Sequence, residues 1–396
     1  MRILQLLPAL HVGGVETGVL DLCRYLKTAG HEPYVVSSGG GLVEELQKEG
    51  IRHILLPVQK KSLLSIIRCI RKLRRVIKNE DIAIVHARSR VPFWVGFFAT
   101  RGTNAVLMAT MHGCYRPTLF SRIVRWIGHI ICPSDFAANY FKDVFGVSFQ
   151  KITIIPRWVD TKKFTYVPYE QRSSIDHTLC YVGRLSSSKG IEYLLRALVK
   201  VKRMYPRTHL MIVGAANRKK FLEELQSEVD RLGLRDSVTF LGNRRDIASL
   251  LQKAHCTIMP SVSYETFGRV IIEAQSCGSV VVATNTGAQG EIIQDGANGF
   301  LVSPQDSEAL ADRIIAVLSD REKAKTMSML ARRIVEEKYT LERIGPQMVE
   351  LYNRVRESPR ILVVKLSSLG DVVLSVAALK SLKRRFPRGS LSVLVL

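Results

Sequence analysis

Short apolar runs, many of them rich in β-branched residues, alternate along this chain with longer segments whose apolar residues recur at helical spacing. The first pattern is typical of buried strands, and the second is typical of helices that cover a sheet. The predicted strands are residues 2–7, 31–37, 82–86, 106–111, 129–133, 152–155, 179–182, 210–213, 238–241, 257–259 and 280–283, and the predicted helices include residues 16–29, 42–49, 267–276 and 340–357. This alternation predicts parallel sheets with helices on both faces.

The alternation is interrupted once, near the middle of the chain. Residues 156–160 and the polar stretch 166–177 separate two series of strands, and 396 residues are too many for one ordinary core. We therefore predict an α/β protein with two Rossmann-like, doubly wound domains, the first over residues 1–160 and the second over residues 161–340. Ligands of such sheets bind at the carboxyl ends of the strands, so the two domains are expected to face a central cleft.

Two carboxylates flank the start of a predicted helix in the second series. Glu265 precedes the helix and Glu273 lies within it. The amides at a helix start favour an anion, whereas carboxylates favour hydroxyl groups, and a ligand with both a phosphate and sugar hydroxyls is a nucleotide sugar. The helix-start residues expected to contact it are Phe267, Gly268 and Arg269. Two glutamates at this spacing also occur on ordinary solvated helices.

Two cations upstream favour the ligand-binding interpretation. Arg184 and Lys189 lie in the loop between a predicted strand and a helix that begins near Gly190. Two cations and free amides in such a loop can hold a pyrophosphate, and the alternative is that both are exposed surface cations. Asn243 follows the predicted strand 238–241 and is expected to lie near the base of the nucleotide.

The first domain contributes a second group of candidates. Gly13 and Gly14 occupy the first strand-to-helix turn, where paired glycines let the backbone approach a ligand, although a lone diglycine is also common in ordinary turns. His112 ends one predicted strand, and His86 and Arg88 end another, which puts all three at the edge of the cleft. His86 and Arg88 are candidate ligands of an acceptor, whereas a lone histidine is often structural.

These motifs, taken in order, resemble the retaining family-four glycosyltransferases of the GT-B fold. The motifs are GRL and KG within residues 183–190, ETFGR and EA within 265–274, CGSVVVAT at 277–284, GAQGE at 287–291 and DGANGFLV at 295–302. The resemblance covers residues 1–357. It implies hexosyl transfer, with retention of configuration, from a nucleoside-diphosphate sugar to a glycan or lipid-linked acceptor.

The resemblance also implies roles for single residues. Glu265 would grip the transferred sugar and Glu273 the ribose, while Arg184 and Lys189 would hold the diphosphate. The loop of Gly13 and Gly14 would line the cleft beside the diphosphate. His112 matches a histidine near the donor sugar and acceptor, and residues 341–357 would form a helix that crosses back onto the first domain.

The chain offers no paired carboxylates of the metal-binding kind. No Asp-x-Asp sequence occurs in it, and that motif holds the divalent ion in the other main glycosyltransferase fold. We therefore expect a metal-independent reaction without a cofactor, in which the nucleotide sugar is a co-substrate. Arg184, Lys189 and helix-start amides would then meet the leaving-group charge, and a β-phosphate oxygen would take the acceptor proton.

The net charge of +23 raises the question of an anionic partner. Nucleic acid is not expected, because no nucleic-acid-binding module accompanies the charge and only 7% of residues are aromatic. Positive charge is concentrated in the segment from Lys60 to Lys78. This segment has eight cations, no acidic residue and apolar residues at helical spacing. This segment is either a surface helix with solvated cations or a helix that attaches to an anionic membrane surface.

Cysteine usage and the N-terminus bear on location. Seven scattered cysteines, an odd number, do not suggest a disulfide framework, and the first residues lack the features of a signal peptide. No apolar run reaches the roughly 18–20 residues of a membrane span. We expect a cytoplasmic protein, peripheral on the inner face of the cytoplasmic membrane if residues 60–78 bind lipid.

The last 39 residues, 358–396, have a different character. A predicted strand at 360–365, the loop 367–371, a helix at 372–385 and a strand at 391–396 resemble the start of family-nine heptosyltransferases of lipopolysaccharide core assembly. Such a fragment cannot bury a core, so we expect the first part of a two-enzyme fusion. Asp371, which matches a candidate base of that family, would be idle. An unrelated strand pair is the alternative.

The neighbouring heptosyltransferase-like segment favours a role in lipopolysaccharide or other surface-glycan synthesis. Two other functions stay open. A sugar-nucleotide epimerase of the GT-B fold would convert the donor without an acceptor and would need an acid/base pair that we cannot place. A non-catalytic membrane-binding relict would bind liposomes without turnover.

Overall fold

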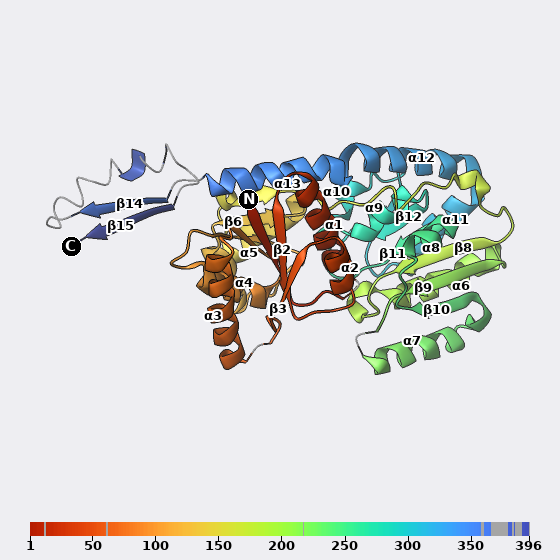
Figure 1. Ribbon diagram of the computed structural model, residues 1–396. Helices are drawn as coiled ribbons and strands as arrows, with labels where there is room; N and C mark the ends of the chain where they lie inside the picture. The colour runs from red at the N-terminus through yellow and green to blue at the C-terminus, as the bar shows by residue number, and fades with distance from the viewer. Residues whose placement is uncertain are drawn as a thin grey trace.

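The computed structural model describes residues 1–11, 13–60, 62–216 and 218–357, together with the backbone of 360–365, 379–381, 384 and 390–395. It confirms the predicted class, because two parallel sheets with flanking helices form two α/β domains (Figure 1). The strand order is β3-β2-β1-β4-β5-β6-β7 in the first domain and β10-β9-β8-β11-β12-β13 in the second. In both orders the chain reverses direction beside the first strand, as in doubly wound folds.

The first domain contains seven strands and five α-helices among its described residues. The strands are β1 (Arg2–Leu6), β2 (Glu32–Ser37), β3 (Arg52–Leu55), β4 (Ile84–Ala87), β5 (Val106–Thr110), β6 (His129–Cys132) and β7 (Ile152–Ile154). The helices are α1 (Gly14–Thr28), α2 (Val43–Lys48), α3 (Leu63–Asn79), α4 (Arg90–Thr100) and α5 (Asp135–Phe145), and a 3-10 segment, η1, spans Ser121–Trp126.

The second domain repeats this plan. Its strands are β8 (His177–Val182), β9 (Thr208–Val213), β10 (Val238–Gly242), β11 (Cys256–Met259), β12 (Val280–Thr284) and β13 (Phe300–Val302). Its helices are α6 (Ile191–Met204), α7 (Lys219–Arg231), α8 (Ile247–Lys253), α9 (Arg269–Ser276), α10 (Gln289–Ile292), α11 (Ser307–Ser319) and α12 (Arg321–Lys338).

Alternate residues of the central strands enter different cores, which shows that both faces of the second sheet are covered. Val280 and Val282 pack in one hydrophobic cluster with α6 and α11, whereas Val281 and Ala283 pack in another with α8 and α9. A strand that is buried on both faces has a continuous run of apolar residues in its sequence, and β12 could therefore be predicted from its valines.

Three elements differ from the sequence-based expectation. The predictions did not include β3, whose residues are partly exposed and include charged side chains, or β13, which has only three residues. Helix α9 begins at Arg269 rather than at residue 267. Its N-cap is Gly268, whose φ of 85° lies in the left-handed region and cannot continue a helix.

Helix α13 (Leu341–Arg356) follows α12 and crosses from the second domain to the first (Figure 1). Its apolar residues Met348, Leu351 and Tyr352 share a buried cluster with Ile3 of β1 and Leu22 of α1. The hydroxyl of Tyr352 is 2.7 Å from His86 Nδ1 and accepts a hydrogen bond of 3.1 Å from Gln5 Nε2. The last helix is therefore fixed to the first domain by packing and by buried polar contacts.

Beyond α13, two strands pair with each other. β14 (Arg360–Lys365) and β15 (Ser390–Val395) form a parallel two-stranded sheet, with Arg360 opposite Ser390. A parallel pair requires a crossover connection. The loop 367–371, including Asp371, and most of the predicted helix 372–385 lie outside the described residues. Within the described part of the chain, no helix is both long and apolar enough to span a bilayer.

Substitution of Tyr352 by phenylalanine should lower the free energy of unfolding by about 1–3 kcal/mol, because it leaves His86 Nδ1 and Gln5 Nε2 without their shared partner in a buried site. Urea denaturation followed by circular dichroism measures this change. The matched control is Tyr193→Phe, at a partly exposed tyrosine of α6. Equal effects of the two substitutions would show that the buried contacts do not hold α13 in place.

Candidate active site

Loops that follow the carboxyl ends of both sheets meet at the junction of the domains. Ser134, after β6, donates a hydrogen bond from its hydroxyl to the Thr266 carbonyl oxygen at 2.7 Å. Glu291, on α10, accepts hydrogen bonds from the backbone amides of Asp135 and Phe136 at 2.9 and 2.7 Å, and so caps the start of α5. The predicted location of the cleft thus coincides with the observed contact between domains.

Lys189 and Glu265 are brought together by backbone contacts between two loops of the second domain. The Val262 and Ser263 amides donate to the Ser188 carbonyl oxygen at 3.0 and 3.2 Å. A Cβ atom on Gly190 would collide with the Pro260 carbonyl oxygen, so the close approach requires glycine there. As a result, Lys189 Nζ forms an ion pair with Glu265 Oε1.

The position of Glu265 is fixed further by its other neighbours. Ser261 Oγ donates to Glu265 Oε1 at 2.9 Å, and the Ala288 amide donates to the Glu265 carbonyl oxygen at 2.9 Å. Gly287 permits the latter contact, because a side chain there would overlap the backbone of Glu265. The motif at residues 287–291 therefore positions one candidate carboxylate and supplies the interdomain cap at Glu291.

Glu273 lies in a different environment from Glu265. It lies within α9, largely but not fully buried, and its Oε1 is 2.9 Å from Nε of Arg269, one turn earlier on the same helix. Burial raises the pKa of the Glu273 carboxyl, while the positive charges of Arg269 and Arg157 oppose that rise. The structure thus pairs Glu273 with Arg269 and does not place it in the ion pair formed by Glu265.

The other predicted donor residues are placed as follows. Arg184 and Asn243 are exposed in the loops after β8 and β10. Phe267 is buried, with its ring centroid 5.7 Å from that of Tyr339, so only its backbone can face a ligand. Gly268 caps α9. Gly13 and Gly14 begin α1, and the carboxylate of Glu16 folds back over Gly13.

The carbonyl oxygen of Gly14 accepts hydrogen bonds from two guanidinium groups. Arg157 Nη2, in the segment after β7, donates to it at 2.6 Å, and Arg269 Nη1, from the second domain, donates to it at 2.8 Å. Arg269 Nη2 is also 3.4 Å from Asp21 Oδ2 of α1. Sequence reasoning did not single out Arg157 or Asp21, because their importance depends on contacts between distant segments.

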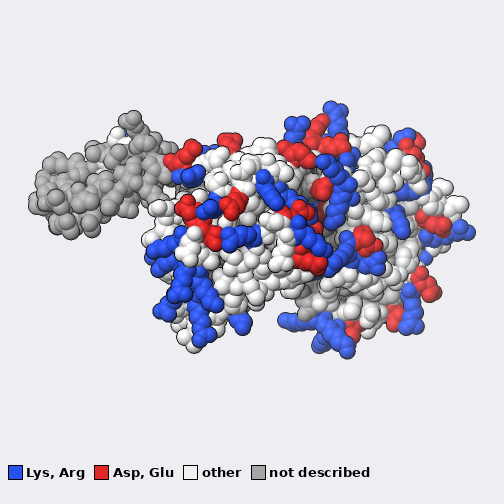
Figure 2. Space-filling model, in the orientation of Figure 1, with Lys and Arg blue, Asp and Glu red and all other residues white. Residues whose placement is uncertain are grey.

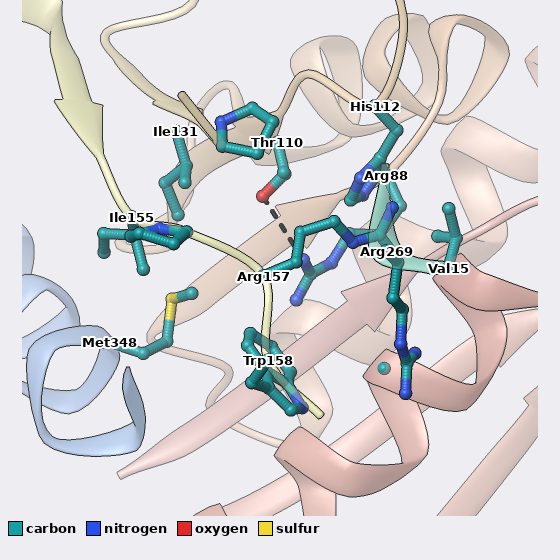
Figure 3. Close-up of a pocket in the computed structure, with 13 residues that line it drawn as sticks. Val15, Arg88, Thr110, His112, Ile131, Ile155, Arg157, Trp158, Arg269 and Met348 are labelled. Atoms are coloured by element: carbon teal, nitrogen blue, oxygen red, sulfur yellow. Dashed lines mark hydrogen bonds between the residues drawn. The ribbon is translucent and has the colours of Figure 1, made fainter. Parts of the chain in front are cut away.

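A narrow cavity lies beside this junction and is lined by Arg88, Thr110, His112, Arg157 and Arg269, with apolar residues on its other sides (Figure 3). It offers about 20 Å³ to a water-sized sphere, which is room for about one water molecule. Both ring nitrogens of His112 are buried without a hydrogen-bond partner. Burial, followed by the charges of Arg157 and Arg88, lowers the pKa of His112 well below its usual value, so the ring is neutral near pH 7.

His86 does not fit its predicted role as an acceptor ligand. It is fully buried, with Nδ1 2.7 Å from the Tyr352 hydroxyl and Nε2 2.7 Å from Thr110 Oγ1, so neither nitrogen is free. Its role is structural, since it links β4, β5 and α13. Arg88 donates to Gln5 Oε1 through Nε and Nη2 and to Thr110 Oγ1 through Nη1, and it still lines the cavity.

Known proteins share this architecture. Two family models match the chain, Glycosyltransferase Family 4 over residues 12–163 and Glycosyl transferases group 1 over residues 170–334. A crystal structure of a glycosyltransferase from Rickettsia africae is 32% identical, with a TM-score of 0.80, and the match covers 90% of this chain and 98% of that one.

Two further proteins are similar at lower identity. The phosphatidyl-myo-inositol mannosyltransferase of Mycolicibacterium smegmatis is 26% identical over 87% of this chain and 90% of its own length. The Anabaena protein HepE, solved in complex with UDP-glucose, is 24% identical, with a TM-score of 0.78. The match covers 89% of this chain and 100% of HepE, and it shows that the two share a fold. The chain spans 45–57% of the length of several other curated relatives that it matches.

The environment of His112 predicts a dependence of stability on pH. The unfolded chain takes up a proton at this histidine below about pH 6.5, whereas the folded chain, with its lowered pKa, does not. Stability should therefore fall as the pH is lowered from 6.5 towards the folded pKa, and His86 contributes with the same sign. Urea denaturation at pH 7.5, 6.5 and 5.5 should show a shallower decline for His112→Asn. An unchanged decline would contradict a neutral, buried His112.

Proposed function

The chain belongs to the glycosyltransferases of family 4 and group 1, which have the GT-B fold, and from this premise we propose that it transfers a hexosyl group from a nucleoside-diphosphate sugar to a glycan or lipid-linked acceptor with retention of configuration. The observation that carries the proposal is the ion pair of Lys189 and Glu265 in loops at the carboxyl end of the second sheet. This pair puts a phosphate-binding cation and a hydroxyl-binding carboxylate side by side, as a nucleotide sugar requires.

Donor binding would exchange the partners of this ion pair. A diphosphate carries more negative charge than a carboxylate and competes with Glu265 for Lys189. Release of Lys189 leaves Glu265 with the Ser261 hydroxyl as its side-chain partner and frees carboxylate oxygens for the hydroxyls of the sugar. Glu273 would contact the ribose, and the exposed loop at Asn243 would lie near the base.

Catalysis would rest on stabilising the leaving group. As the bond between the anomeric carbon and the diphosphate oxygen breaks, negative charge grows on the diphosphate. Arg184, Lys189 and the amides at the start of α9 would neutralise it. The acceptor hydroxyl attacks the anomeric carbon from the face that the diphosphate leaves, and its proton passes to a β-phosphate oxygen. This sequence needs no metal ion and no cofactor, and it yields the glycoside and the nucleoside diphosphate.

His112 would bind a hydroxyl group near the transferred sugar. Because its ring is neutral, it offers one donor and one acceptor, and neither nitrogen has another partner in the structure. It would orient this hydroxyl by accepting a hydrogen bond from it through one nitrogen, rather than by carrying charge, and its N–H would remain free to donate elsewhere.

A role in lipopolysaccharide or other surface-glycan synthesis is part of the proposal. It is supported by the resemblance of residues 358–396 to family-nine heptosyltransferases, and the parallel pair β14–β15 is compatible with the strand–helix–strand start of such an enzyme. The name of the Mycolicibacterium relative supports a lipid-borne acceptor. The epimerase and the relict are less well supported, because both family models describe transferases and the candidate donor residues are all present.

Membrane attachment through α3 is a second part of the proposal. The helix packs on the first domain through Cys69, Leu73 and Ile77, while Leu63 and Leu64 near its start are about 70% exposed. Figure 2 shows Lys and Arg side chains gathered over this region. The exposed cations of α3 are Arg68, Arg71, Lys72, Arg75 and Lys78.

An aromatic cluster next to α3 extends this surface. Trp94, Phe97 and Phe98 of α4, the helix on which α3 packs, contact the ring of Trp126 or one another at centroid distances of 5.4–6.0 Å. Trp126 is 59% exposed and nearby Leu119 is 79% exposed. Exposed tryptophan and leucine beside a basic helix are typical of proteins that bind the interface of an anionic bilayer.

Loss of a donor cation should reduce turnover more than stability. Arg184→Gln should lower kcat by about 10²-fold, the usual cost of one group that stabilises growing transition-state charge, and the fold should be unaffected because Arg184 is exposed. Release of UDP or GDP from nucleotide sugars measures the rate, and Arg203→Gln, at an exposed arginine of α6, is the matched control. Full activity of Arg184→Gln would refute this role, and loss of wild-type activity with EDTA would refute the metal-independent reaction.

Membrane binding is predicted to depend on the cations of α3. Replacement of Arg68, Arg71, Lys72 and Arg75 by glutamate should abolish cosedimentation with phosphatidylglycerol vesicles at low salt, since each cation near an anionic surface contributes about 1 kcal/mol. The control replaces Lys219 and Lys220 of α7, on the other domain, by glutamate. If the wild type stays in the supernatant, α3 is only a solvated surface helix.

A further inference from the structure

Three arginines from three separate segments converge on the cavity between the domains. Arg88 follows β4, Arg157 follows β7 and Arg269 begins α9, and all three line the cavity together with His112 (Figure 3). A cavity that can admit about one water molecule is thus lined on one side by three arginines and by an imidazole whose nitrogens have no partner, and on its other sides by apolar residues. Such a concentration of hydrogen-bond donors calls for a compensating acceptor.

The charges of these arginines are unequally compensated. Arg269 is paired with Asp21 and Glu273. Arg88, by contrast, donates only to the neutral groups of Gln5 and Thr110.

Arg157 donates only to the Gly14 carbonyl oxygen. In the part of the chain that the structure describes, neither Arg88 nor Arg157 forms an ion pair. Glu273 and Glu16 act on Arg157 through longer-range attraction. Removing a cation from water without an anion is costly, so the buried charge of Arg88 lacks a counter-charge, while Arg157 is partly exposed beside it.

The free donors suit an oxyanion. A guanidinium has five N–H groups, and Arg88 uses three of them and Arg157 one. The planar fork of arginine matches the oxygens of a phosphate, and His112 adds another donor. Because the cavity admits only about one oxygen atom, the rest of the anion would lie at its mouth, beside Arg157.

This cluster is distinct from the donor loop. Arg88 and Arg157 follow β4 and β7 of the first domain and line the cavity, whereas Arg184 and Lys189 follow β8 of the second domain and are not among the residues that line it. A diphosphate on Arg184 and Lys189 would therefore leave Arg88 and Arg157 unoccupied. We propose that Arg88, Arg157 and His112 form a second anion site, which binds a phosphate ester carried by the acceptor. This inference rests on the proposed glycosyl transfer and specifies the class of its acceptor.

The test measures the binding of two ligands, a nucleoside diphosphate and glycerol 3-phosphate, to the full-length protein. UDP and GDP are titrated first by isothermal titration calorimetry, and the one that binds is then kept at saturation while glycerol 3-phosphate is titrated. The wild type should bind glycerol 3-phosphate under these conditions, and Arg157→Gln should weaken that binding by about tenfold or more, as expected for a charge-assisted hydrogen bond. Lys189→Met is the converse variant and should weaken binding of the nucleotide while sparing that of glycerol 3-phosphate.

Several results would overturn the inference. Competition between glycerol 3-phosphate and the nucleotide would mean a single anion site, and unchanged binding to Arg157→Gln would place the phosphate elsewhere. Equal binding of acetate would contradict a phosphate-specific site. If Arg157→Gln does not fold, His112→Gln provides the second variant and should also weaken glycerol 3-phosphate binding. Failure of the proposed transferase function would show differently, as absence of UDP and GDP binding with phosphate binding intact.

The source of the phosphate is resolved in a second arm. Binding to phosphatidylinositol vesicles is compared between the wild type and Arg157→Gln, which share the same α3. A weaker interaction of Arg157→Gln with the vesicles assigns the phosphate to a lipid head group. A defect confined to glycerol 3-phosphate assigns it to a soluble acceptor, and both results support the site.

Discussion

The Gly14 carbonyl oxygen, which accepts hydrogen bonds from Arg157 and Arg269, is the contact on which the geometry of the cleft depends. One guanidinium comes from the segment that leaves the first domain and the other from the second domain. The extensive hydrophobic clusters lie within the domains rather than between them. Polar contacts, together with the ring contacts of Phe136 and Tyr140 with Tyr264, therefore set how the carboxyl ends of the two sheets face each other.

The same region explains how many positive charges can be held close together. Glu273 neutralises Arg269, which lies one turn earlier in α9, and Glu265 neutralises Lys189 in the absence of a donor. In the proposed donor binding the second pairing, between two loops, would be exchanged, whereas the first joins two residues of one helix and belongs to the fold. Two glutamates that look equivalent in the sequence thus have different partners, one a lysine of another loop and one an arginine of its own helix.

The architecture could be predicted from local patterns, and the site only in part. The valines of β12 and the glycines around α9 are signals carried by neighbouring residues, and they predicted the strand and the limits of the helix to within two residues. His86 was assigned to the acceptor because its partner Tyr352 is 266 residues away and no local pattern reveals that contact. Arg157 was missed for the same reason. Its segment has the sequence features of a linker, and only the structure shows its hydrogen bond to the Gly14 carbonyl oxygen.

A crystal structure of the protein with the nucleoside diphosphate that it binds is the most direct test of the central claim. The account predicts that the diphosphate lies on Arg184 and Lys189, that the ion pair between Lys189 and Glu265 is broken, and that the ion pair between Arg269 and Glu273 is unchanged. A nucleotide bound elsewhere, with Lys189 still paired to Glu265, would contradict it.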